Sequence, residues 1–124
     1  MDHLIIEGGR ALFGSVRVHG SKNAALPILA ATVLAAGEYE ICDVPQLRDI
    51  DVMRQILQSI GIKVTERSDR ITLDTSTINS LHIPDDLMGQ MRSSIFLMGP
   101  LLTRYKEVIL SRPGGCAIGA RPVD

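Results

Sequence analysis

A cysteine near the end of the chain lies among residue types that favour thiol chemistry. Cys116 belongs to the stretch RPGGCAIGAR, which also contains three glycines and has Arg112 and Arg121 at its two ends. Glycines let backbone N–H groups approach a ligand closely, and nearby cations make a thiol more reactive. The stretch predicts a loop with an accessible, reactive thiol. The alternative, that Cys116 only fills space as buried cysteines commonly do, stays open on local sequence.

A second candidate for binding chemistry lies in the stretch HGSKNAALP. Lys22 and Asn23 stand there at the predicted junction between a strand and a helix. Backbone N–H groups at a helix N-terminus attract anions, and a lysine adds a mobile positive charge. This corner suits a phosphate or a carboxylate. A simpler and commoner interpretation is that Asn23 only caps the helix and Lys22 is a solvated neighbour.

The remaining polar candidates carry less information. Arg92, in GQMRSSIF, lies on a predicted helix with an apolar opposite face, where an arginine is typically turned to solvent. Cys42 lies inside the predicted strand YEICDV, and we expect it to be buried and inert. His3, His19 and His82 are scattered without a second ligand at a metal-binding spacing, so no metal site is predicted. The glycine-rich stretches match neither a P-loop nor a dinucleotide fingerprint, and we predict no cofactor.

Composition limits the classes of function. The 124 residues are 45% hydrophobic with a formal net charge of −1, enough for one core and without a basic field for nucleic acid. The first residues do not resemble a secretory signal, and the longest apolar stretch, 24–36, is too short to span a bilayer. Both cysteines are interpreted as free thiols. We therefore predict a soluble, cytoplasmic protein with neither nucleic acid nor membrane as partner.

The elements that must position these residues alternate between strands and helices. The segments 3–8 and 14–20 predict a hairpin, and Ser68–Asp69 predicts the turn of a second one. The helix expected at 85–105 is predicted to be interrupted or kinked near Gly99–Pro100. This order predicts an α/β (α+β) domain followed by the start of a further repeat. Helices are expected at 22–36, 47–60 and 85–105, and strands at 38–44, 62–66, 70–75, 77–84 and 106–113.

Four segments carry a resemblance to a known family. GSKNAALPILAATVLA, DVPQLRDI, MRSSIFLMGPLL and PGGCAIGARPVD together resemble the N-terminal part of the bacterial UDP-N-acetylglucosamine enolpyruvyl transferases of peptidoglycan synthesis. The resemblance covers essentially the whole chain. It implies transfer of the enolpyruvyl group of phosphoenolpyruvate to the 3′-hydroxyl of UDP-N-acetylglucosamine, with release of phosphate. The alternatives are a shikimate-type enolpyruvyl transferase, which lacks this cysteine loop, and a non-catalytic anion-binding module of the same fold.

The resemblance assigns a role to each candidate. Cys116 matches the general acid that protonates the methylene carbon of phosphoenolpyruvate and can form a covalent adduct with it. Lys22 and Asn23 match the phosphoenolpyruvate pair, and Arg92 matches the helix arginine of the UDP-sugar region. Arg112 departs from the family pattern, in which an apolar residue precedes the proline. The segment that begins the UDP-sugar site, with its arginine also near the phosphate, is matched by Arg121, Pro122, Val123 and Asp124.

The resemblance also implies an architecture. Family members are built from two inside-out α/β barrel domains of repeated βαβαββ units, with the active site between the domains. Residues 1–21 would belong to the second domain of the full enzyme, and residues 22–124 would form part of the first. We accordingly expect a fragment that needs the remainder of its own chain to complete the site, including the base for the sugar hydroxyl, and that is inactive alone.

Overall fold

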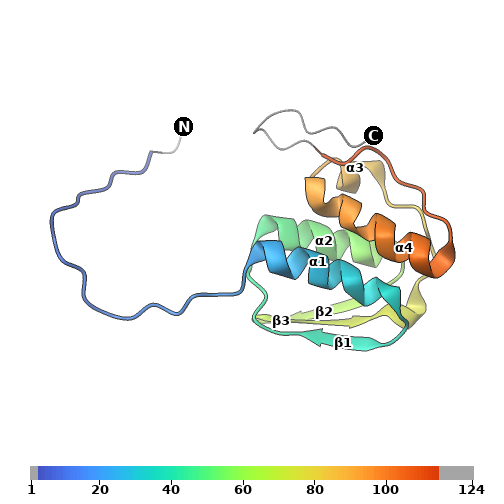
Figure 1. Ribbon diagram of the computed structural model, residues 1–124, viewed down its shortest axis with the longest axis horizontal. Helices are drawn as coiled ribbons and strands as arrows, with labels where there is room; N and C mark the ends of the chain where they lie inside the picture. The colour runs from blue at the N-terminus through green and yellow to red at the C-terminus, as the bar shows by residue number, and fades with distance from the viewer. Residues whose placement is uncertain (1–2, 115–124) are drawn as a thin grey trace.

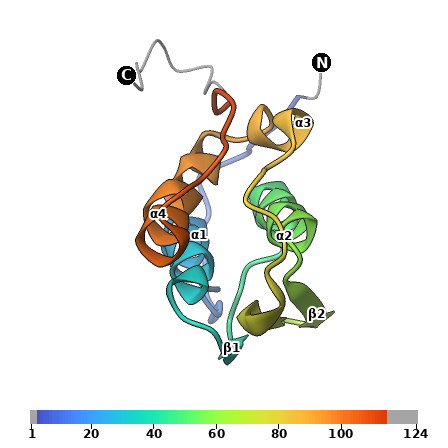
Figure 2. The ribbon, with the colours of Figure 1, turned by 90° about the vertical axis from the view of Figure 1, so that its right-hand side faces the viewer.

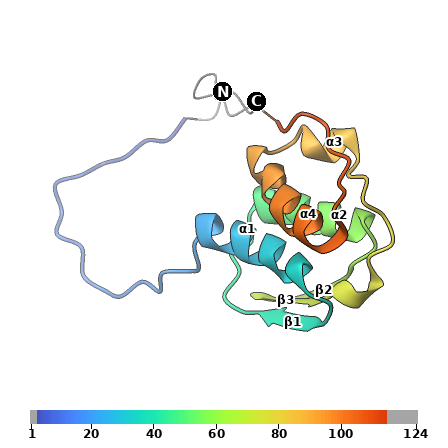
Figure 3. The same ribbon diagram turned by 45° about the vertical axis from the view of Figure 1, so that its right-hand side comes forward.

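The computed structural model describes residues 3–114. Within this range a three-stranded sheet lies at one side of the molecule, and the helices lie in two further levels above it (Figure 1). Helices α1 and α2 run side by side over the sheet, and α3 and α4 lie beyond them (Figures 2 and 3). The elements are α1 (Lys22–Ala31), η1 (Thr32–Leu34), β1 (Glu38–Ile41), α2 (Arg48–Ser59), β2 (Lys63–Arg67), β3 (Arg70–Asp74), η2 (Thr75–Thr77), α3 (Asp85–Met88), η3 (Arg92–Leu97) and α4 (Met98–Tyr105), where η denotes a 3₁₀ helix.

The sheet is antiparallel, with β3 between β1 and β2. Successive side chains of a strand point to opposite faces, and in β3 Ile71 and Leu73 are buried whereas Arg70 and Thr72 are exposed. On the outer face, the Arg70 guanidinium lies 3.1 Å from a Glu40 carboxylate oxygen. One face of the sheet is thus apolar and covered by helices, and the other is polar.

The amphipathic pattern of α2 is confirmed. The core that α2 shares with α1, α4 and the inner face of the sheet is formed by long aliphatic side chains, which gain the most from leaving water. Gly61 follows α2 with a φ of +98°, and a Cβ there would come within 2.5 Å of Asn79 Oδ1, so only glycine fits. Among the fully buried side chains are Leu26, Leu29, Met53, Ile56, Leu57, Ile60, Leu73, Leu97 and Leu101.

The hairpin predicted at the N-terminus is absent, and that prediction is wrong for this structure. Residues 3–20 contain neither helix nor strand, and the segment extends away from the domain (Figures 1 and 3). The Leu4 and Val16 side chains are 94% and 88% exposed. A two-stranded hairpin is marginal by itself, and these apolar residues have no neighbouring surface to cover within the described residues.

The second hairpin is confirmed. Strands β2 and β3 pair in register from Lys63 opposite Asp74 to Arg67 opposite Arg70. The turn between them includes Ser68, whose φ of +55° is in the left-handed region. The predicted strands 77–84 and 106–113 are wrong, because they shrink to one parallel bridge between His82 and Ile109.

The long helix predicted at 85–105 is divided into α3, η3 and α4. The break lies between Met88 and Arg92, where Met91 has the extended angles φ −148° and ψ 146°. An interruption near Gly99–Pro100 is present as the boundary between η3 and α4 at Leu97 and Met98, but the larger break lies earlier, at Met91. Pro100 lies in the first turn of α4, where a missing N–H removes no intrahelical bond. No helix of the described part of the chain has both the length and the apolar character needed to cross a membrane.

Candidate functional site

The anion corner predicted at the start of α1 lies within the described residues. Ser21 holds the N-cap position with an extended backbone, and its carbonyl accepts hydrogen bonds from the N–H groups of Ala24 at 3.1 Å and Ala25 at 2.9 Å. Lys22 and Asn23 are therefore the first two helical residues, and the prediction that Asn23 caps the helix is wrong. Their N–H groups point along the helix axis without an acceptor inside the helix, as at any helix N-terminus.

Lys22 has a carboxylate partner that the sequence did not reveal. Its Nζ donates to Oδ2 of Asp49 at 2.7 Å, although the two residues are 27 positions apart. Asp49 lies in the first turn of α2, where a helix N-terminus favours a negative charge. Figure 1 shows that α1 and α2 begin at the same end of the molecule. The corner thus combines two helix N-termini, one lysine and one carboxylate.

The chain enters this corner through a close backbone contact. Gly20, just before the N-cap residue, lies against Asp43, and a Cβ at residue 20 would come within 1.9 Å of the Asp43 carbonyl oxygen. Asp43 itself has a φ of +58°, so the backbone turns sharply after β1. Only glycine permits such an approach, and the contact fixes where Lys22 leaves the loop and enters α1.

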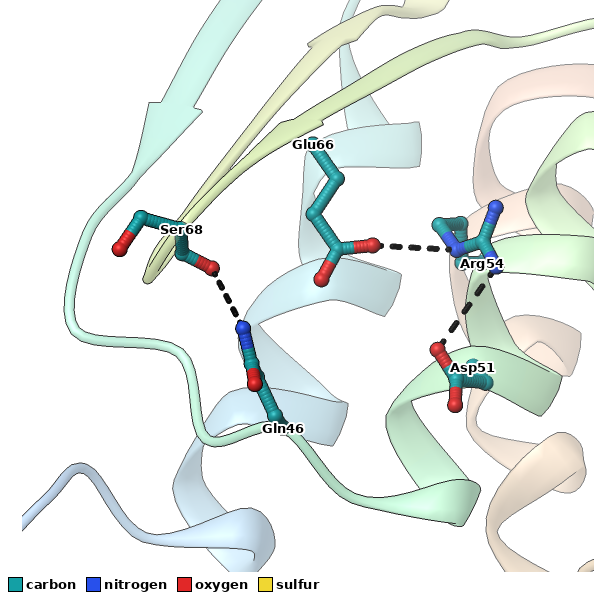
Figure 4. Close-up of polar contacts among 5 residues, drawn as sticks. All are labelled: Gln46, Asp51, Arg54, Glu66 and Ser68. Atoms are coloured by element: carbon teal, nitrogen blue, oxygen red, sulfur yellow. Dashed lines mark hydrogen bonds and ion pairs between the residues drawn. The ribbon is translucent and has the colours of Figure 1, made fainter.

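Helix α2, which carries Asp49, is tied to the β2–β3 hairpin by polar contacts (Figure 4). The guanidinium of Arg54 lies 3.6 Å from Asp51 on its own helix and 3.5 Å from Glu66 on β2. The side-chain amide of Gln46, in the loop before α2, donates to the Ser68 carbonyl at 3.2 Å. These contacts hold the N-terminal half of α2 in place relative to the sheet.

Arg92 lies at the start of η3, not on a long helix as predicted. Its side chain is half-buried, and the residue directly follows the extended Met91. Helix α1 packs against η3, so the elements that carry Lys22 and Arg92 are neighbours. The structure thus brings the predicted phosphoenolpyruvate element and the predicted UDP-sugar element together.

The segment that leads to the cysteine loop is anchored beside Arg92. The Gly114 N–H donates to the Met88 carbonyl at 2.8 Å, and a Cβ at residue 114 would lie 2.1 Å from the Gly89 carbonyl oxygen. The same Cβ would lie 3.1 Å from the Met91 nitrogen. Nearby, the Ser111 hydroxyl donates to Oδ1 of Asp85. The described chain therefore ends in close contact with the α3–η3 turn.

Five of the predicted site residues lie outside the described residues. The roles given to them remain predictions, and they concern the reactive thiol and the start of the UDP-sugar segment. These residues are Cys116, Arg121, Pro122, Val123 and Asp124.

The prediction that Cys42 is buried is wrong. Its side chain is exposed, and its Sγ lies 3.6 Å from Oε1 of Glu40. Along β1 the half-buried Tyr39 and Ile41 alternate with the exposed Glu38 and Glu40, and Cys42 continues the exposed series. In the sequence, the two glutamates at alternate positions before Cys42 were the signal that this side of the strand faces solvent.

The fold and the corner define an α/β domain with a site suited to an anion. The chain belongs to the EPSP synthase (3-phosphoshikimate 1-carboxyvinyltransferase) family, whose model matches residues 6–124. The prediction of an enolpyruvyl transferase fold is confirmed, because the structure is similar to the enolpyruvyl transferase NikO from Streptomyces tendae. The TM-score is 0.70 at 27% identity, over 79% of this chain and 23% of that protein.

Within this family, the chain is similar to one named group of proteins. The UDP-N-acetylglucosamine 1-carboxyvinyltransferase of Cellvibrio japonicus is 50% identical over 125 residues, which cover 100% of this chain and 30% of that protein. UDP-N-acetylglucosamine 1-carboxyvinyltransferase 2 of Caldanaerobacter subterraneus subsp. tengcongensis is 51% identical, over 96% of this chain and 28% of that protein. The chain therefore spans about 30% of the length of these relatives. The predicted resemblance to this group is confirmed.

Proposed function

We propose that the full protein transfers the enolpyruvyl group of phosphoenolpyruvate to the 3′-hydroxyl of UDP-N-acetylglucosamine and releases phosphate. The observation that carries this proposal is the identity of about 50% over the whole chain to proteins named for this transfer. The family also includes 3-phosphoshikimate transferases, so the acceptor is the point that an experiment must decide.

The proposed reaction is an addition followed by an elimination. The Cys116 thiol gives a proton to the methylene carbon of phosphoenolpyruvate, which leaves a positive charge on the carbon that bears the phosphate oxygen. The 3′-oxygen of the sugar attacks that carbon and gives up its own proton to a base. Loss of a proton from the new methyl group, together with cleavage of the C–O bond to phosphate, restores the double bond. A thiolate can also trap the cationic carbon reversibly, which explains a covalent adduct.

The other predicted site residues have supporting roles in this proposal, and of these Lys22, Asn23 and Arg92 lie among the described residues. The Lys22 ammonium and the N-terminus of α1 hold the phosphate, with Asn23 beside them and Arg121 as a second cation. Arg92 contributes to the UDP-sugar site, which continues at 121–124. Positive groups at the phosphate stabilise the charge that develops as phosphate leaves.

We further propose that residues 1–21 pack on a second domain and that the remainder of the protein's chain completes the site. The support is the row of apolar side chains in 3–20 that pack on nothing within the described residues, among them Ile6, Phe13 and Val18. Exposed apolar strips of this kind mark surfaces that are covered by another part of the protein. Transfer to UDP-N-acetylglucosamine would place the protein in cytoplasmic cell-wall synthesis.

The test is phosphate release by the purified full-length protein supplied with phosphoenolpyruvate and UDP-N-acetylglucosamine, with mass spectrometry of the product. Turnover with the UDP-sugar and none with shikimate 3-phosphate is expected. The Cys116→Ala variant should lose most turnover, whereas Cys116→Asp keeps a proton donor and should retain some. Turnover with shikimate 3-phosphate alone would assign the other activity of the family. Phosphoenolpyruvate binding without turnover on either acceptor would indicate the non-catalytic module.

A further inference from the structure

Asp49 lies outside the set of predicted site residues, yet its carboxylate holds the lysine of the proposed phosphate site. The Lys22 Nζ to Asp49 Oδ2 distance of 2.7 Å is that of a short, charge-assisted hydrogen bond. The two side chains are 42% and 34% exposed, so the pair lies at an edge of the domain that a small ligand can reach.

The backbones on both sides of this pair are fixed. Asp49 is followed by Ile50, Val52 and Met53, all buried in the core, and the Ile50 N–H donates to the carbonyl of Leu47 at 2.9 Å. On the other side, α1 buries Ala25, Leu26 and Leu29. The carboxylate of Asp49 therefore extends toward Lys22 from a helix that cannot easily move.

We propose that Asp49 is a positioning residue that holds the Lys22 ammonium at the N-terminus of α1 for the phosphate of phosphoenolpyruvate. The inference rests on the proposed function of that site. A lysine side chain is flexible, and ordering it beforehand reduces the conformational entropy that binding costs. An ammonium group has three donors, so a bond to Asp49 is compatible with a second bond to a phosphate oxygen.

A carboxylate near a phosphate also repels it, so positioning and repulsion by Asp49 change phosphoenolpyruvate affinity in opposite directions. The direction of the change on removal of the carboxylate therefore tests the proposal. If Asp49 acted only through its charge, removal of that charge would tighten phosphoenolpyruvate binding. If Asp49 positions Lys22, removal of the carboxylate weakens binding. The N-terminus of α2 and the open solvent both reduce the repulsion, so we expect positioning to be the larger effect.

The experiment compares Asp49→Asn, Asp49→Glu and wild type in the full-length enzyme. For Asp49→Asn the KM for phosphoenolpyruvate should rise about three- to fivefold, the upper part of the range for a partly exposed charged pair, and the KM for UDP-N-acetylglucosamine should stay within about twofold. Asp49→Glu keeps the carboxylate and should restore part of the loss. The matched control is Asp51→Asn, which removes a charge from the same turn of α2 but whose carboxylate pairs with Arg54.

A double-mutant cycle shows whether the effect passes through Lys22. In a Lys22→Met background, Asp49→Asn should change the phosphoenolpyruvate KM by less than about twofold. An unchanged or lowered KM in Asp49→Asn, an equal rise in both KM values, or the same rise without Lys22 would each overturn the proposal. A wild-type enzyme that releases no phosphate would instead contradict the proposed function, which is a separate outcome.

Discussion

The backbones of Gly20 and Asp43 touch at the entry to the candidate site, so closely that a Cβ on Gly20 would come within 1.9 Å of the Asp43 carbonyl oxygen. The obstacle is backbone in the turn just after β1 and cannot rotate out of the way as a side chain could. The entry of the chain into α1, and with it the place of Lys22, therefore depends on a residue without a side chain.

Replacement of Gly20 by alanine should consequently move the start of α1. We expect Gly20→Ala to lower the free energy of unfolding by about 1–3 kcal/mol, the usual cost of forcing an extra methyl group into a packed contact. The phosphoenolpyruvate KM should rise as well, because the Lys22 backbone shifts. Urea denaturation and steady-state kinetics measure the two effects. Gly99→Ala is the control, since a Cβ at Gly99 meets no atom within 4 Å; equal effects at both positions would contradict this role of Gly20.

Gly114 makes a similar contact at the base of the cysteine segment. A Cβ there would lie 2.1 Å from the Gly89 carbonyl oxygen, so Gly114→Ala should displace the chain that leads to Cys116. We expect a fall of about tenfold or more in kcat, because catalysis is sensitive to small displacements of reacting groups. Gly99→Ala, in open space on α4, should leave kcat unchanged. An unchanged kcat in Gly114→Ala would show that this contact does not position the loop.

The exposure of Cys42 changes how thiol labelling must be designed. Because its side chain is exposed, iodoacetamide should modify Cys42 as well as Cys116, and accessibility alone does not identify the reactive thiol. An epoxide such as fosfomycin should modify Cys116 alone, as the family resemblance implies. Peptide mass spectrometry on wild type and Cys42→Ser distinguishes the two sites. Epoxide adducts on Cys42, or loss of turnover in Cys42→Ser, would contradict the assignment of Cys116.

The parts of the fold that the sequence predicted are those determined by local interactions. The period of apolar residues in α2 and the turn at Ser68 depend on neighbours a few positions away. The expected strands at 3–8, 77–84 and 106–113 depend on partners far along the chain, and only the bridge between His82 and Ile109 formed. A strand needs a neighbouring edge as well as a suitable composition.

The candidate site was predictable to the same extent. A lysine beside a helix start indicated the anion corner, because helix N-termini attract anions wherever they occur. The carboxylate that pairs with Lys22 was not predictable, since nothing local relates position 22 to position 49. Asn23 was assigned as the cap because its residue type favours that position, but the backbone of Ser21 begins the helix instead.

Asp74 gives the domain an acid-sensitive contact at the end of β3. Hydrogen bonds from the Ser76 hydroxyl at 2.5 Å and the Ser76 N–H at 3.0 Å hold the pKa of Asp74 below its ordinary value of 3.8. A lowered folded-state pKa stabilises the fold above pH 3.8, and this stabilisation is lost as the pH falls through the lower value. NMR titration should show the lowered pKa in wild type and a rise toward 3.8 in Ser76→Ala. An identical titration curve in both proteins would exclude the Ser76 hydroxyl as the cause.

The last prediction is that Lys22 and Arg92 each affect the binding of a different substrate. Lys22→Ala should weaken phosphoenolpyruvate binding by about 1.5–3 kcal/mol, the range for hydrogen bonds to charged groups, and change the KM for UDP-N-acetylglucosamine little. Arg92→Ala should do the reverse. Because Arg92 is half-buried, thermal unfolding of Arg92→Ala must be measured beside its kinetics, and Arg92→Lys keeps the charge while it removes the planar guanidinium. If Lys22→Ala bound phosphoenolpyruvate as tightly as wild type, Lys22 would serve only the ion pair with Asp49 and would have no role at the phosphate.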